Sequence, residues 1–94
     1  MLIVLEGLDG SGKATQAALL GQALSAQGRQ VRSISFPDYQ SPSSALVKMY
    51  LHGEIGSLDE VNPYAASSFY SLDRYISFMR SWREDYAAGT IILA

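Results

Sequence analysis

Short apolar runs alternate along this chain with longer stretches in which apolar residues recur every three or four positions. Three strands are predicted where β-branched and apolar residues cluster, at residues 2–6, 29–36 and 90–93. Helices are predicted at residues 13–27, 44–52 and 62–88, and a glycine follows each of them. Strands that alternate with helices favour right-handed crossovers, so we expect an α/β fold in which a parallel sheet carries helices on both faces.

The loop between the first predicted strand and the first predicted helix reads EGLDGSGKAT, residues 6–15. A glycine-rich loop between a strand and a helix is the context of a phosphate-binding loop. Gly7 and Gly12 allow the backbone to curl around an anion, and the start of the helix contributes partial positive charge. Lys13 adds a mobile ammonium group. The loop therefore predicts binding of a nucleoside triphosphate, with a plain glycine turn as the alternative.

The residue after Lys13 departs from the usual pattern. A Ser or Thr is expected there because its hydroxyl ligates Mg²⁺, but this chain has Ala14. Thr15 comes next, yet one step along a helix turns the side chain by about 100°. The loop thus predicts phosphate binding more strongly than it predicts a metal ligand.

Composition narrows the class of protein. Of 94 residues, 48% are hydrophobic and 17% charged, which suits a folded core. The net charge is −2 and the seven basic residues are scattered, which argues against a nucleic-acid partner. The chain has no cysteine and His52 is its one histidine, so disulfides and His/Cys metal clusters are excluded. No signal peptide and no apolar run of the roughly 20 residues that span a bilayer is visible, so we expect a cytoplasmic protein without membrane contact.

The long predicted helix has two distinct faces. Three apolar residues share one arc of the helix surface: Leu72, Ile76 and Met79. This arc is expected to be part of the core or a contact between subunits. Tyr70 and Arg74 lie one turn apart on the other side, next to several serines. They form either a solvated surface or a pair that stacks on a nucleobase and hydrogen-bonds its edge. Asp73 precedes Arg74 and can orient its guanidinium.

Four segments, taken together, resemble one known family. They are LIVLEGLDGSGKATQ at the start, FPDY after the second strand, YLHGEIG after the second helix and SLDRY within the long helix. In this order and at these distances they resemble the thymidylate kinase family of P-loop nucleoside monophosphate kinases, over all 94 residues. The resemblance implies a P-loop NTPase fold with three α/β/α layers. It also implies transfer of the γ-phosphoryl group of ATP to dTMP, giving dTDP and ADP, with Mg²⁺ and with a homodimer packed through long helices.

The resemblance also implies roles for residues of the loop. Lys13 would contact the transferring phosphoryl group, and Asp9 would meet the 3′-hydroxyl of the acceptor sugar and help to organise Mg²⁺. A turn-stabilising role for Asp9 is the alternative. The residues implied to hold ATP are Gly7, Leu8, Asp9, Gly10, Ser11, Gly12, Lys13, Ala14 and Thr15.

Residues for the acceptor follow from the resemblance in the same way. Phe36 and Pro37 are similar to a wall of the thymine pocket, although Phe36 can also be a core residue. Leu51 is similar to a leucine that lines this pocket, and it can equally serve helix packing. Tyr70 is similar to the aromatic residue that stacks on thymine, and Arg74 to the arginine that hydrogen-bonds the base edge.

Several positions depart from the family. Some members carry an arginine after F-P to grip the acceptor phosphate, whereas this chain has Asp38 and Tyr39. Tyr39 can donate a hydrogen bond to the acceptor but supplies no positive charge. Gly10 stands where one subgroup has an arginine, and members with glycine there use an arginine of a mobile lid. The resemblance places that lid beyond residue 94, so we expect a single kinase domain truncated before the lid and the C-terminal half, and a very poor catalyst in isolation.

Three other functions stay open from the sequence. One is a kinase for a deoxynucleoside or another nucleotide, which acceptor specificity would reveal. Another is a P-loop switch or motor ATPase, against which the F-P turn and the spacing of Tyr70 and Arg74 argue. The third is a non-catalytic nucleotide-binding remnant, a hypothesis that Ala14 favours because it lacks the usual metal-ligating hydroxyl.

Overall fold

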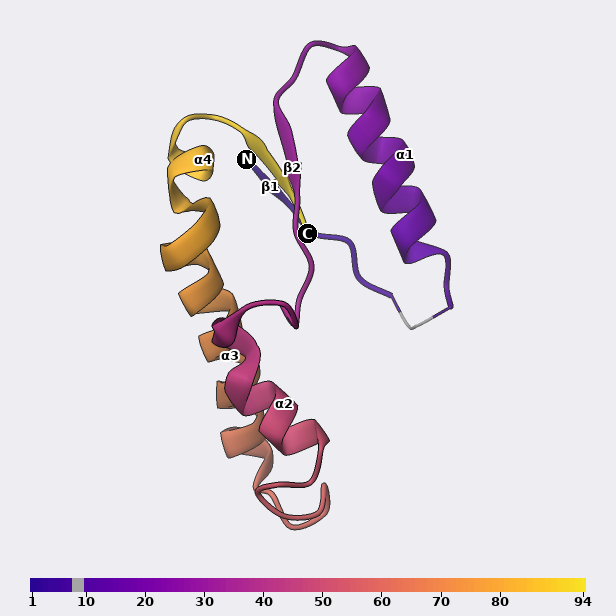
Figure 1. Cartoon of the computed structure of the whole chain (residues 1–94). Helices are drawn as coiled ribbons and strands as arrows, with labels where there is room; N and C mark the ends of the chain where they lie inside the picture. Colours follow the sequence, from indigo (N-terminus) through magenta and orange to yellow (C-terminus); the bar gives the residue numbers. More distant parts are fainter. Residues whose placement is uncertain (8–9) are drawn as a thin grey trace. The chain divides into compact units, whose positions relative to one another are not determined.

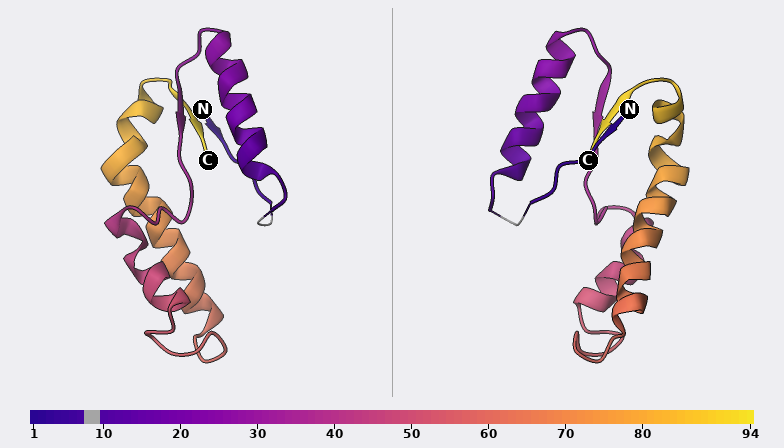
Figure 2. Two further views of the ribbon diagram at one scale, coloured as in Figure 1. Left: turned by 45° about the vertical axis from the view of Figure 1, so that its right-hand side comes forward. Right: turned by 180° about the vertical axis from the view of Figure 1, so that it is seen from behind.

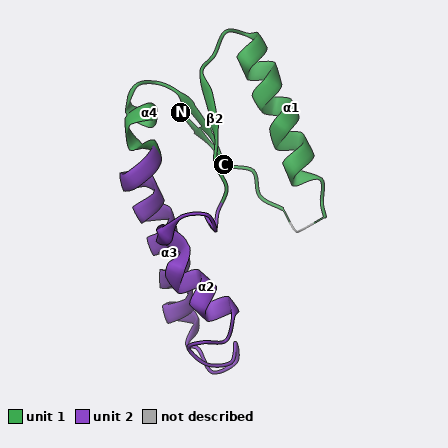
Figure 3. Cartoon of the chain, in the orientation of Figure 1, with its two compact units in different colours: residues 1–35, 82–94 green, residues 36–81 purple. Residues whose placement is uncertain are grey.

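The computed structural model describes residues 1–7 and 10–94, and its chain divides into two compact units (Figures 1 and 3). Residues 1–35 and 82–94 form one unit, and residues 36–81 form the other. The strands are β1 (Leu2–Ile3), β2 (Val31–Ser33) and β3 (Ile91–Leu93). The helical elements are α1 (Lys13–Ala26), a 3₁₀ turn η1 (Pro42–Ser44), α2 (Ala45–Leu51), α3 (Pro63–Ser77), a π-helical segment η2 (Phe78–Trp82) and α4 (Arg83–Ala87).

The first unit contains the parallel sheet that the sequence predicts. Its strand order is β1-β3-β2, with Ile92 opposite Leu2 on one side and opposite Arg32 on the other. All three residues of β3 are buried. Figures 1 and 2 show α1 on one side of this sheet and α4 on the other. The predicted α/β architecture with helices on both faces is therefore confirmed.

The strands are shorter than the apolar runs that predict them. The runs at residues 2–6 and 29–36 contain strands of two and three residues, respectively. Both are edge strands that pair with the three-residue β3 alone, so the length of β3 limits the ladder on each side. Single backbone bonds continue it, from Leu5 N to Ala94 O at 2.8 Å and from Ile34 N to Leu93 O at 2.9 Å.

Helix α1 packs against the sheet through one narrow stripe of residues. Four half-buried positions follow helical spacing: Ala17, Leu20, Gly21 and Leu24. A Cβ at Gly21 would lie 3.6 Å from a methyl group of Leu93, so the small residue brings the helix close to β3. No residue of α1 is fully buried, and Leu19 on its outer side is 54% exposed. The helix ends as predicted, because Gly28 adopts the left-handed φ of 80° and donates to Ser25 O.

The second unit is built from α2 and α3, which lie side by side in all views of Figures 1 and 2. Asn62 caps α3, because its side-chain oxygen accepts a hydrogen bond from Tyr64 N at 2.7 Å, and Pro63 occupies the first turn. The buried positions of α3 are Ala66, Asp73 and Ser77.

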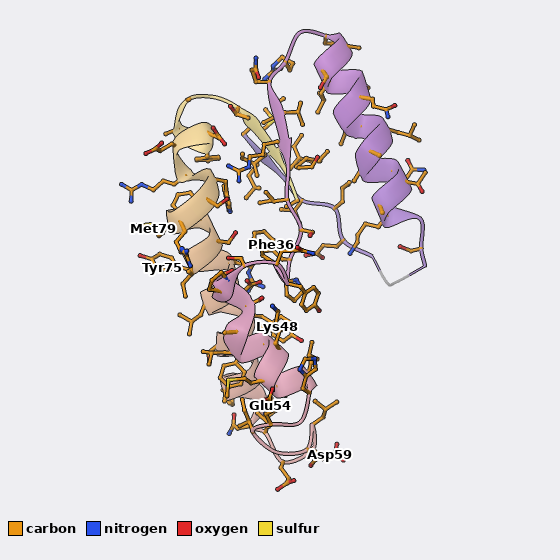
Figure 4. All side chains as sticks on the ribbon, in the orientation of Figure 1. Phe36, Lys48, Glu54, Asp59, Tyr75 and Met79 are labelled. Atoms are coloured by element: carbon orange, nitrogen blue, oxygen red, sulfur yellow. The ribbon has the colours of Figure 1, made fainter. Side chains whose placement is uncertain are left out.

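The exposed side of α3 corrects one expectation. Leu72 and Met79, expected as core or as a subunit contact, are 43% and 44% exposed, and only Ile76 of that arc is half-buried. Figure 4 shows Tyr75 and Met79 on the side of the helix away from α2. A core role for Leu72 and Met79 within this chain is therefore wrong, because the short α2 covers the polar side of the helix instead.

The predicted helix at residues 62–88 is not continuous. It is divided into α3, the π-helical turn η2 and the short α4, and it ends before Gly89, whose φ is 92°. Apolar periodicity alone could not reveal the break, because a π-helical turn typically occurs as a single turn inside an otherwise α-helical stretch. Within residues 1–7 and 10–94, no helix has the length and apolar character needed to cross a membrane.

Candidate functional site

The phosphate-binding loop of the first unit adopts the backbone that its glycines permit. Gly10 and Gly12 have φ values of 80° and 86°, which residues other than glycine rarely adopt. Gly12 caps α1, and Gln16 N donates to Gly12 O at 3.0 Å as the first helical bond. A helix start leaves its first N–H groups without intrahelical partners, and the first turn of α1 contains no acidic side chain. The loop therefore ends in a positive helix terminus suited to an anion.

Lys13 folds back over the loop. Its Nζ donates to the carbonyl oxygen of Gly7 at 3.5 Å, at the exposed surface. A hydrogen bond of this length is weak, so a phosphate oxygen can replace the carbonyl as the partner of the ammonium group. Ser11 lies close by, because a Cβ at Gly7 would come within 2.7 Å of Ser11 Oγ. The predicted residues Leu8 and Asp9 lie outside the described residues.

The described part of the loop offers few ligands for a metal ion. The side chain of Ala14 has no oxygen, and the side-chain hydroxyls belong to Ser11 and Thr15, both exposed. No group of three or more His, Cys, Asp or Glu residues comes together among residues 1–7 and 10–94. Mg²⁺ commonly keeps several waters and is held through substrate phosphates and one or two carboxylates. These residues therefore fit a metal ion that arrives with a nucleotide, and they do not form an all-protein metal cage.

The predicted acceptor residues belong to the second unit. Tyr70 is half-buried on α3, and the exposed Arg74 follows one turn later, with its Nη2 donating to Ser71 Oγ at 3.3 Å. The ring of Tyr50 on α2 meets Tyr70 edge-on, with centroids 6.4 Å apart. Burial raises the pKa of the Tyr70 phenol, and the neighbouring phenols of Tyr39 and Tyr50 raise it further. Tyr70 thus presents a phenol ring supported by Tyr50, and Arg74 follows it one helical turn later.

The remaining predicted acceptor residues have different surroundings. Phe36 and Pro37 are half-buried at the start of the second unit, and a cis peptide bond joins them. Tyr39 is 50% exposed, on the loop that leads into η1. Leu51 lies at the end of α2 and is 44% exposed.

The role of Asp73 differs from the one expected. Its carboxylate accepts hydrogen bonds from Asp38 N at 3.1 Å and from Ser43 Oγ at 2.8 Å. Arg74 is instead held by Ser71. Asp73 therefore connects α3 to the loop that carries Tyr39. Neither Ser43 nor Tyr50 was singled out from the sequence, because their contacts depend on how α2 and η1 pack on α3.

A shallow hollow of about 430 Å³ also lies between α1 and β2 in the first unit. It is lined by Ala18, Gly21, Gln22, Ser25, Val31 and Ser33. None of the predicted site residues lines it.

These features define a class of protein. A parallel sheet whose first strand leads through a glycine-rich loop with Lys13 into α1 is the architecture of a P-loop nucleotide-binding protein. The thymidylate kinase family model matches residues 5–94, and the chain belongs to this family. The resemblance seen in the sequence and the P-loop fold that it implied are thereby confirmed.

Relatives of known name agree with this family. A thymidylate kinase of Mycobacterium tuberculosis is 43% identical over 75 residues, which cover 79% of this chain and 35% of the relative. Thymidylate kinases of a Synechococcus species and of Bifidobacterium longum are 38% and 29% identical over 93 residues, 99% of this chain. Those matches cover 43% and 45% of the relatives, so the chain spans less than half of their length.

Proposed function

We propose that the protein carrying these residues transfers the γ-phosphoryl group of ATP to dTMP, giving dTDP and ADP. The observation that carries this proposal is the match of the thymidylate kinase family over residues 5–94. The geometry of each unit is compatible with it, since the first holds a phosphate-binding loop and the second holds an aromatic ring beside a guanidinium group.

On the donor side, the phosphates of ATP would lie in the loop formed by residues 7–15. The first N–H groups of α1 would bind phosphate oxygens, and Lys13 would exchange the Gly7 carbonyl for the transferring phosphoryl group. Asp9 would face the acceptor hydroxyl. When bound with ATP, Mg²⁺ would neutralise charge on the phosphates. Phosphoryl transfer depends mainly on positioning and charge neutralisation, so these contacts would supply most of what this part of the chain contributes.

On the acceptor side, Tyr70 would stack on the thymine ring and Arg74 would hydrogen-bond its edge. Phe36 and Pro37 would form a wall of the same pocket, with Leu51 as an apolar neighbour. The half-exposed hydroxyl of Tyr39 would donate a hydrogen bond to the acceptor.

The oligomeric state, the partners and the location of the enzyme are proposals of the same kind. A homodimer would use the exposed apolar residues of α3, among them Leu72 and Tyr75, because a second copy would remove them from water. The enzyme would work in the cytoplasm, without a nucleic-acid or membrane partner. Residues 1–94 alone would be a very poor catalyst, because Lys13 and Arg74 supply only part of the positive charge that phosphoryl transfer needs.

The test is acceptor specificity in the complete protein, followed as ADP formation with ATP and Mg²⁺. We expect dTMP to be phosphorylated and dAMP and deoxythymidine to be poor acceptors. Phosphorylation of deoxythymidine in preference to dTMP would indicate a nucleoside kinase instead. Hydrolysis of ATP without an acceptor would indicate a switch or motor ATPase, and tight ATP binding without transfer would indicate a remnant.

A further inference from the structure

A fully buried carboxylate lies on α3, the helix that also carries two of the proposed acceptor residues. Asp73 has no exposed surface, and both of its oxygens are used, Oδ2 by the N–H of Asp38 and Oδ1 by the hydroxyl of Ser43. Burying a charge is costly unless hydrogen bonds compensate for it, so a carboxylate at this position has a strict requirement for both donors.

The two donors belong to one short turn. Between Asp38 and Ser43 the chain closes on itself, because Ser41 N donates to Asp38 O at 3.0 Å. Ser41 Oγ in turn accepts from Ser43 N at 3.3 Å. The Asp73 carboxylate therefore holds both ends of this turn, and Tyr39 projects from within it with half of its surface exposed.

The helix that carries Asp73 also carries the two base-reading residues. Tyr70 lies three positions before it and Arg74 one position after it, all on α3 and all in the same compact unit as the turn. The two hydrogen bonds to Asp73 tie the turn, and Tyr39 within it, to the helix that carries Tyr70 and Arg74, so a displacement of the turn would move Tyr39 relative to that helix.

We propose that Asp73 is a positioning residue for the acceptor site, which holds the Asp38–Ser43 turn, and with it Tyr39, in place on α3, the helix that carries Tyr70 and Arg74. This inference rests on the proposed function, because it assigns Asp73 to the acceptor half of that site. Asp73 does not touch the acceptor itself. Its carboxylate acts through the turn, so its loss weakens dTMP binding and leaves ATP binding as it was.

Two substitutions of similar shape, tested in the complete protein, separate the hydrogen bonding of Asp73 from its packing. In Asp73→Asn, the amide oxygen accepts from Asp38 N–H and the amide nitrogen donates to Ser43 Oγ, which can act as an acceptor. In Asp73→Leu, the branched shape is retained but no acceptor remains for the Asp38 N–H. We expect the KM for dTMP to stay within about twofold of wild type in Asp73→Asn and to rise about tenfold in Asp73→Leu, with the KM for ATP unchanged in both.

A second readout follows the turn directly. Hydrogen exchange of the Asp38 amide should be as slow in Asp73→Asn as in wild type and faster in Asp73→Leu. Ser43→Ala removes one of the two bonds and should raise the KM for dTMP about threefold. Ser77→Ala alters another buried polar residue of the same helix and should leave both KM values unchanged, whatever it does to stability.

The outcomes distinguish this inference from the proposed function. A wild-type protein that does not phosphorylate dTMP would refute the proposed function, whatever the variants do. An active wild type whose Asp73→Leu variant raises neither KM, or raises both equally, would overturn the positioning role. If Asp73→Leu does not fold, an unchanged KM for dTMP in folded Ser43→Ala would overturn it as well.

Discussion

The ring of Tyr50 on α2 meets the ring of Tyr70 on α3 edge-on, with centroids 6.4 Å apart and planes at 83°. Tyr50 also packs against Phe69, with centroids 6.1 Å apart. The edge of one aromatic ring is attracted to the face of another, and such a pair holds both rings in a defined orientation. The ring assigned to thymine stacking is therefore supported from α2 by a residue with no assigned contact to the substrate.

Replacing Tyr50 should consequently affect the acceptor and not the donor. Tyr50→Ala removes the supporting ring, and we expect the KM for dTMP to rise about threefold to tenfold because an aromatic pair contributes about 0.5–1.5 kcal/mol. Tyr50→Phe retains the ring and should behave like wild type. Steady-state kinetics with dTMP and ATP varied separately provide the measurement, and an equal rise of both KM values would contradict the prediction.

Lys13 should be required for catalysis. Lys13→Ala removes the ammonium group that folds over the loop, and we expect kcat/KM for ATP to fall about 100-fold or more, as it does when a charge-stabilising donor is lost. The other lysine of the chain, Lys48 on α2, provides the control, because Lys48→Ala removes the same charge elsewhere. Activity of Lys13→Ala near that of Lys48→Ala would exclude the role in phosphoryl transfer.

Ala14 should set how much Mg²⁺ the enzyme needs. Ala14→Ser restores the hydroxyl that the loop pattern usually places after the lysine, and this hydroxyl can ligate the metal ion. We expect the Mg²⁺ concentration for half-maximal activity to fall severalfold, measured at saturating ATP and dTMP. Ala14→Val, which adds bulk without an oxygen, controls for the change in size and should not lower it.

The exposed apolar side of α3 should mediate self-association. Leu72 and Tyr75 are 43% and 61% exposed. Leu72→Lys combined with Tyr75→Lys would place two charges in an apolar contact, and we expect light scattering to show a shift from dimer to monomer. Ser67→Lys adds a charge at another exposed position of the helix and should leave the dimer intact. A wild-type monomer would refute the proposed dimer directly.

The Tyr70 phenol should ionise only at unusually alkaline pH. Its pKa is raised above 10.0, first by burial and then by the phenols of Tyr39 and Tyr50. Because the folded state favours the neutral phenol, this contribution to stability is fully present below pH 10.0 and is lost as the pH rises through the raised pKa. Tyrosinate absorbance should show one late-titrating group that Tyr70→Phe removes. A Tyr70 that titrates at or below pH 10.0 would contradict the prediction.

The helix boundaries were largely predictable because their signals are local. Asn62 caps α3 with its own side chain, and Gly28 and Gly89 adopt left-handed backbone after α1 and α4. Strand lengths were not predictable from the sequence, since the length of a strand depends on how many residues of the neighbouring strand are available for pairing. The buried side of α3 was also missed, because apolar periodicity pointed to Leu72 and Met79, whereas the residues covered in this chain include Asp73 and Ser77.

The amino-acid sequence by itself determined the class of this protein. A glycine-rich loop with Lys13 between a strand and a helix requires only contiguous residues, so phosphate binding could be predicted and the family inferred without coordinates. The tertiary structure decided what surrounds the predicted acceptor residues. Tyr50 reaches Tyr70, and Asp73 holds Asp38 and Ser43, across separations of 20 to 35 residues. Such contacts depend on how α2 and η1 pack on α3, and no local pattern of residues specifies that packing.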